Sequence, residues 1–196
     1  MNTLEKYIPE ESVPGVLKLI QTQNLDISIV NRRQTKHGDF KQLPNGKFQI
    51  TINNNLNEHQ FLLTLIHEIA HHYTLRNYGR VKPHGKEWKY TFQKLMLPFL
   101  RPEIFPHSVL PYLAQYLKNP KASTDSDVKL SLALRNHKAE SGKSFIFDLP
   151  LGAIFTFKNK QYTKGPKRRT RYECLELGSK RIYLFNQNAE VDIHEE

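Results

Sequence analysis

The sequence contains a single cysteine, Cys174, among its 196 residues. One cysteine cannot form an internal disulfide, and it excludes the zinc ribbons that take their ligands from pairs of cysteines. No segment approaches the roughly 18 consecutive apolar residues of a membrane-spanning helix, and residues 1–10 lack the apolar stretch of a secretory signal. We therefore expect a globular cytoplasmic protein with no membrane partner, in which any zinc site uses histidine and carboxylate.

Acidic residues are also few: 19 Asp and Glu stand against 29 Lys and Arg, which gives a formal net charge of +10. Such an excess attracts nucleic acid through long-range attraction and counterion release. It is also common in proteins that never bind DNA. Charge alone therefore leaves DNA open as a partner.

The first 118 residues have mainly helical periodicity. Asn57 is a suitable N-cap and Gly79 a suitable stop for the strongest helix. The turn Pro44-Asn45-Gly46 separates two strand-like segments that we expect to form an antiparallel pair. The expected helices cover residues 10–23, 57–77, 84–97 and 108–117, and the expected strands cover residues 26–32 and 47–53.

The C-terminal third has a different pattern. A polar stretch at residues 119–127 indicates a hinge, and a short helix is expected at 127–137. After Ser141 apolar residues alternate with polar ones, which predicts about four strands. The fold class is α+β, with a core at 1–118, a linker and short helix at 119–140, and a small all-β C-terminal domain at 141–196.

Residues 67–71 have the sequence His-Glu-Ile-Ala-His. Two imidazoles four residues apart lie on one face of a helix, where a single Zn²⁺ can bind both. Glu68 is rotated by about 100° from His67, so it is not a first ligand but can reach a metal-bound water as general base. This chemistry is peptide hydrolysis. The alternative is a helix that happens to carry two exposed histidines and a solvated glutamate.

A catalytic zinc takes three protein ligands and keeps a fourth position open. His84 follows Pro83 where the next helix is expected to begin, and that location suits the third ligand. A lone histidine at a helix end is more often a solvated turn residue. His72 follows His71 directly and points about 100° away, so we expect a group behind the ligands or at the surface.

The segments His67-Glu68-Ile69-Ala70-His71-His72-Tyr73 and His84-Gly85-Lys86-Glu87-Trp88 resemble the SprT-like metalloprotease family, the relatives of Spartan. The resemblance covers roughly residues 10–100. It implies a mainly helical, minigluzincin-like protease core with a small β-sheet. It also implies one zinc ion per chain, bound by His67, His71 and His84, with Glu68 as the catalytic residue.

Relatives in that family include DNA-dependent proteases that degrade proteins crosslinked to DNA. Many of them carry a Cys-rich zinc ribbon after the core, and this chain departs from that pattern because Cys174 is alone. The partners implied are a protein substrate and, as a further candidate, DNA.

A second basic feature lies between two expected strands, where eight residues contain five cations that suit phosphate contacts. A solvated hairpin tip is an equally good interpretation. Tyr162 and Tyr172 flank this run, and alternating aromatic residues in a small β domain are more often core than stacking platforms. The candidate DNA-binding residues are Lys164, Lys167, Arg168, Arg169 and Arg171.

Three functions remain open from the sequence. The first is a zinc-dependent endopeptidase acting on DNA-associated or DNA-crosslinked proteins. The second is a DNA-binding or assembly module with a zinc site and no proteolytic activity. The third is a metal-dependent hydrolase of another amide, which would use the same residues. The absence of a nearby fourth cysteine or histidine ligand favours an enzyme, because structural zinc sites are normally closed.

Overall fold

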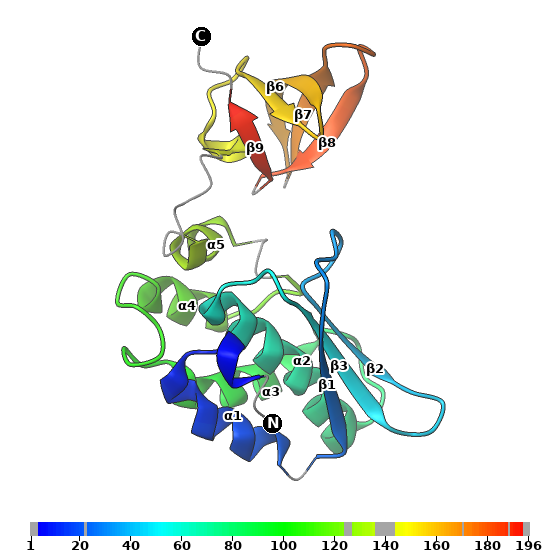
Figure 1. The fold of residues 1–196 in the computed structure, drawn as a ribbon, viewed down its shortest axis with the longest axis vertical. Helices are drawn as coiled ribbons and strands as arrows, with labels where there is room; N and C mark the ends of the chain where they lie inside the picture. The colour runs from blue at the N-terminus through cyan, green and yellow to red at the C-terminus, as the bar shows by residue number, and fades with distance from the viewer. Residues whose placement is uncertain are drawn as a thin grey trace. The chain divides into compact units, whose positions relative to one another are not determined.

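The protein is described by a computed structural model that covers residues 4–21, 23–123, 127–135, 144–169, 171–187 and 189–193. It divides into two compact units, Met1–Ala122 and Ser123–Glu196 (Figure 1). The helices and the two sheets make it an α+β protein. Among the described residues, no helix combines the length and apolar character that crossing a bilayer requires.

The helices of the first unit lie where the sequence predicts them, within a few residues at each end. Pro14 sits in the first turn of the first α-helix, where its missing N–H costs nothing. The helix Lys86–Met96 is followed directly by a short 3-10 turn that contains Pro98. The bounds are η1 Glu5–Tyr7, η2 Glu10–Ser12, α1 Val13–Ile20, α2 Glu58–Tyr78, α3 Lys86–Met96, η3 Leu97–Phe99 and α4 Leu110–Leu117.

Helix α2 is the central element of this unit. Asn57 and Gln60 form a capping box at its start, in which each side chain bonds the other residue's backbone N–H. Gly79 ends it with a φ of 68°, as expected for a glycine stop. Its apolar side chains, which include Phe61, Leu62, Leu65, Ile66 and Ile69, are fully buried. The helix that carries the motif is therefore held rigidly by the core.

The expected antiparallel pair of strands is wrong. Strands β1 (Leu25–Val30) and β3 (Phe48–Asn53) are parallel, and β3 is the central strand in the order β1-β3-β2. Strand β2 (Gly38–Gln42), which the sequence analysis missed, pairs antiparallel with β3. The turn at Pro44-Asn45-Gly46 joins β2 to β3, so the chain from β1 crosses to the far side of β3 before it returns.

The crossing segment after β1 is fixed by a clamp between Arg33 and Asn53. The Arg33 Nε–H donates to Asn53 Oδ1 at 2.9 Å, and its other guanidinium nitrogens donate to the side chain and carbonyl of Thr51. Asn53, 1% exposed, donates in return to the carbonyls of Arg33 and Lys36 at 3.2 and 2.8 Å. The loop that leads into β2 is therefore tied to the central strand.

The second unit begins with α5 (Val128–Arg135) and continues as a six-stranded sheet in the order β4-β9-β5-β6-β7-β8. Its core contains Phe155, Tyr162, Cys174 and Phe185. The expected short helix is present, and two more strands are found than expected. Part of the expected linker and the end of the expected helix lie outside the described residues. The strands are β4 Ser144–Phe145, β5 Ile154–Phe157, β6 Lys160–Arg168, β7 Arg171–Glu176, β8 Ile182–Asn186 and β9 Glu190–Ile193.

Candidate metal centre

Three imidazole nitrogens meet at one point in the first unit. His67 and His71 lie one turn apart on α2, and their Nε2 atoms are 3.3 Å from each other. The Nε2 atom of His84 lies 3.1 Å from that of His67 and 3.0 Å from that of His71. Two nitrogens bound at about 2.0–2.1 Å to one tetrahedral ion would be about 3.3–3.4 Å apart. The spacing therefore fits a single metal ion.

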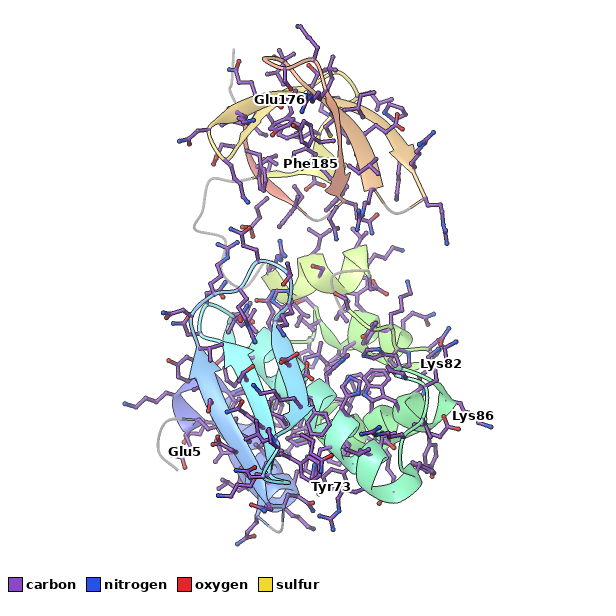
Figure 2. All side chains as sticks on the ribbon, turned by 90° about the vertical axis from the view of Figure 1, so that its right-hand side faces the viewer. Glu5, Tyr73, Lys82, Lys86, Glu176 and Phe185 are labelled. Carbon is purple, nitrogen blue, oxygen red and sulfur yellow. The ribbon has the colours of Figure 1, made fainter. Side chains whose placement is uncertain are left out.

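His84 reaches the other two histidines from a tight turn. The Gly85 N–H donates to the Lys82 carbonyl at 2.9 Å, which places Pro83 second and His84 third in the turn. His84 has a φ of 56°, a left-handed conformation that a type II turn requires at its third residue and normally gives to Gly or Asn. Such a conformation costs roughly 1–3 kcal/mol for a residue with a Cβ. Lys82 and Lys86 flank this turn at the surface (Figure 2).

The three imidazoles are neutral near pH 7, which is the form that binds a metal. Burial, followed by repulsion from His71 and His84, holds the pKa of His67 well below its usual value. Burial and the neighbouring His84 lower the pKa of His71 to about 4, and burial lowers the pKa of His84. Among the described residues, no other His, Cys, Asp or Glu joins this cluster.

Trp88 forms the wall behind the histidines. Its ring centroid lies 4.6 Å from those of His67 and His84 and 5.3 Å from that of His71. The indole is 1% exposed and stacks on Phe92, 5.0 Å away along α3. Helix α3 begins directly after the turn that contains His84. Its residue Trp88 therefore lies close enough to contact and orient all three imidazole rings.

Glu68, the residue after His67 on α2, is also buried, with 7% of its surface exposed. Burial, and then the Asp39 carboxylate, raise the pKa of Glu68 to about 8, against opposing effects of Arg33 and Lys36. A divalent cation nearby would favour the ionised form and lower this pKa. The residue is therefore a carboxyl group that can exchange a proton near neutral pH.

Gly38, the first residue of β2, packs directly against Glu68. A Cβ atom built on Gly38 would lie 2.6 Å from Glu68 Oε1, 2.8 Å from Glu68 Cγ and 2.8 Å from Thr64 Cγ2. These distances are too short for any side chain, so the position requires glycine if Glu68 keeps its place. Gly38 is not among the predicted site residues, because β2 is not among the predicted strands. The signal was present in the Pro-Asn-Gly turn, which predicts a strand on each side.

His72 belongs to the core and not to the metal cluster. It is fully buried, its Nε2 atom lies 3.0 Å from Gln23 Oε1, and its ring contacts Phe48 edge-on at 4.7 Å. As expected, His72 is not part of the cluster; of the two positions expected for it, the one at the surface is wrong, because the sheet covers this side of α2. The side chain joins α2 to the sheet and to the segment after α1.

The profile of the SprT-like family matches residues 11–104, which include every residue of this cluster. Residues 11–104 of the chain belong to the SprT-like family. Protein SprT of Vibrio atlanticus (strain LGP32) is 48% identical over 40 residues, which are 20% of this chain and 24% of that protein. The chain thus matches about a quarter of the length of this relative. No solved structure gave a match.

The basic hairpin lies outside the SprT-like region, in the second unit, where β6 and β7 meet. Lys167, Arg168, Arg169 and Arg171 are exposed, although Arg168 pairs with Glu173 at 3.0 Å. Lys164 differs from them. It is 4% exposed and donates to the carbonyls of Phe147 and Leu149, so its ammonium group stabilises the fold of this unit and is not available to a phosphate.

We expect the SprT-like region to gain stability from zinc through His84. At a free Zn²⁺ concentration of 100 times Kd, binding to the folded state adds about 2.7 kcal/mol to the free energy of unfolding. In His84→Ala this gain should largely disappear, because only two imidazoles remain. The measurement is the thermal unfolding midpoint with and without Zn²⁺ after chelator treatment. His107→Ala, an exposed histidine of the same unit, is the control. An equal gain in His84→Ala would contradict the assignment.

Proposed function

We propose that this chain is a zinc-dependent endopeptidase in which His67, His71 and His84 bind one zinc ion and Glu68 is the catalytic base. The observation that carries the proposal is the group of three Nε2 atoms, 3.0–3.3 Å apart, with a buried carboxyl group one residue from His67. Membership of residues 11–104 in the SprT-like family supports it. A minigluzincin-like core is part of the same proposal.

The metal and the protein have separate tasks. A zinc ion held by His67, His71 and His84 would supply a Lewis acid that activates water as a nucleophile near neutral pH. The Glu68 carboxylate accepts a proton from the attacking water and returns it to the departing amine. Trp88 and Phe92 exclude solvent behind the ligand rings, which strengthens electrostatic interactions in the site.

The direct test is Glu68→Gln. The amide keeps the shape of the side chain but cannot accept the proton, so kcat for cleavage of an unfolded, basic protein substrate should fall by roughly 10²–10⁴-fold. The zinc content should remain that of the wild type. Glu58→Gln, at the exposed start of α2, is the matched control and should cleave normally. Retained cleavage by Glu68→Gln would refute the catalytic role, and zinc binding without any wild-type cleavage would favour a binding module.

Gly38→Ala tests whether the contact with β2 positions Glu68. The added methyl would displace the carboxyl group, so we expect kcat to fall at least about tenfold, or about 1.4 kcal/mol in activation free energy, with zinc retained. Gly178→Ala is the control, since a Cβ there meets nothing within 4 Å. Unchanged kcat in Gly38→Ala would show that Glu68 tolerates displacement.

We also propose that the substrates are proteins associated with or crosslinked to DNA. The net charge of +10 and the exposed cations of the β6–β7 hairpin, Lys167, Arg168, Arg169 and Arg171, support this part of the proposal. Lys164 is left out of the proposed DNA-binding residues, because its ammonium group is buried and bonded to backbone carbonyls. The cytoplasmic location expected from the sequence stays a prediction.

The double variant Arg169→Glu with Arg171→Glu tests the hairpin. Each lost phosphate contact should reduce the salt dependence of binding to duplex DNA by about 0.9 in log–log slope. Fluorescence anisotropy of a labelled duplex at several salt concentrations measures this slope. Lys118→Glu with Lys129→Glu, at two exposed lysines that are not part of the hairpin, makes the same charge change. If both double variants weaken binding equally, the hairpin is not a specific contact site.

A further inference from the structure

Strand β8 lies at one edge of the second sheet and carries exposed apolar side chains. Within the described residues, β8 pairs only with β7. Three consecutive residues of β8 are exposed: Ile182 at 65%, Tyr183 at 38% and Leu184 at 50%. Edge strands present unpaired N–H and C=O groups, and proteins usually protect them with charges, proline or a covering segment. β8 has apolar side chains in place of such protection, which is typical of a surface that binds a partner.

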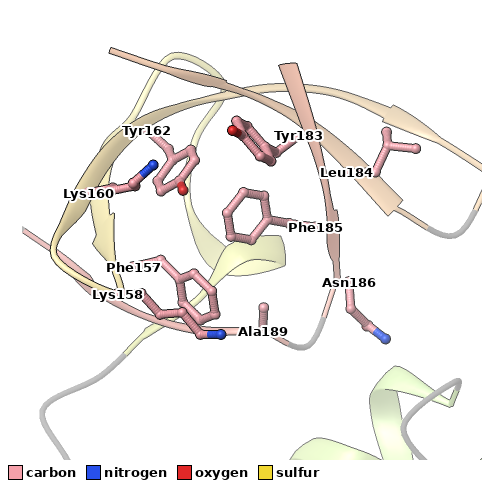
Figure 3. Close-up of a pocket in the computed structure, with 9 residues that line it drawn as sticks. All are labelled: Phe157, Lys158, Lys160, Tyr162, Tyr183, Leu184, Phe185, Asn186 and Ala189. Carbon is pink, nitrogen blue, oxygen red and sulfur yellow. The ribbon is translucent and has the colours of Figure 1, made fainter. Parts of the chain in front are cut away.

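A pocket of about 550 Å³ opens beside this edge (Figure 3). Its floor is formed by Tyr162 and Phe185, which are 5% and 8% exposed and meet at a centroid distance of 4.8 Å. Tyr183 contacts Tyr162 edge-on at 5.8 Å, and Phe157 contacts Phe185 edge-on at 5.3 Å. The pocket therefore offers an apolar recess directly next to the pairing edge of β8.

The residues that line the pocket include two lysines and no carboxylate. Lys158 lies in the two-residue turn between β5 and β6, where it and Asn159 have φ values of 51° and 61°. Turns of this kind favour Asn-Gly, so a lysine there is held in a costly conformation. Its Nζ atom lies 5.6 Å from the centroid of the Phe157 ring. Lys160 is the second cation, paired with Glu176 at 2.9 Å. Because the two lysines outnumber Glu176, the rim still favours a ligand with negative charge.

The ring arrangement favours a peptide over an unpaired nucleobase. Stacking a base requires a free aromatic face. The rings of Tyr162 and Phe185 are almost entirely buried and make edge-on contacts with their neighbours, so only Tyr183 offers much exposed surface. An extended peptide would use the open edge through backbone hydrogen bonds, while alternate side chains enter the adjoining recess.

We propose that β8 and the adjoining pocket bind an extended acidic segment of another protein, which adds to the sheet as a further strand and places an apolar side chain in the pocket, against the rings that line it. An acidic residue next to that side chain would meet Lys158 at the rim of the pocket. This binding site lies wholly in the second unit and does not depend on the proposed peptidase activity.

The test uses the full chain carrying Glu68→Gln and a fluorescein-labelled peptide in which Phe and Leu alternate with Asp and Glu. Tyr183→Ala and Lys158→Glu should each weaken binding by roughly tenfold or more, as measured by anisotropy. Amide hydrogen exchange within β8 should slow when the peptide is bound, because the outward N–H groups become bonded. Lys158→Glu changes an exposed turn residue, so it keeps the test valid if Tyr183→Ala does not fold.

Matched control variants distinguish binding at this site from non-specific binding of the peptide to apolar or basic surface. Leu151→Ala removes another apolar side chain, 70% exposed, and Lys129→Glu reverses another exposed charge of the same unit, so both should bind as the parent does. A peptide with Lys in place of Asp and Glu should bind more weakly. The proposal is overturned if amide hydrogen exchange within β8 is unchanged when the peptide is added. It is also overturned if a thymidine oligonucleotide binds and is weakened by the two variants, while the acidic peptide does not bind. A dimer that is seen in sedimentation and abolished by Tyr183→Ala would overturn it as well.

Discussion

Two histidines one helical turn apart can share an ion with a third ligand only if the chain returns to the same face of the helix. Here the return takes a short connection from Gly79, the end of α2, to the turn at Lys82–Gly85. His84 reaches the other imidazoles because its backbone is left-handed. The burial of α2 and the indole of Trp88 fix the remaining freedom of the rings. The position of the ligands therefore depends on this one turn.

The carboxyl group beside the histidines depends on a different part of the chain. Gly38 lies against Glu68, and the loop before Gly38 is attached to β3 by the mutual hydrogen bonds of Arg33 and Asn53. The sheet thus supports Glu68, while the helices support the three histidines. Because these supports come from different parts of the chain, we expect the histidine cluster and Glu68 to respond to substitutions at different positions.

Local signals in the sequence were sufficient for the parts of the fold that local chemistry decides. The cap at Asn57, the stop at Gly79 and the spacing of His67 and His71 located α2 and the first two histidines. The parallel pairing of β1 with β3 depends on a chain crossing that no short sequence pattern encodes, so the predicted antiparallel pairing is wrong. The burial of His72 and Lys164 likewise results from tertiary contacts, since polar residues are normally expected at the surface.

Because the backbone at His84 is left-handed, the residue that would best stabilise the turn is not the residue that provides the third imidazole nitrogen. A glycine at that position would relieve the turn and lower the free energy of the metal-free fold, yet it would remove one of the three nitrogens. Strained residues cluster at functional sites, where the energy of binding a ligand can compensate for the strain. Selection for thermostability alone would therefore be expected to discard this histidine.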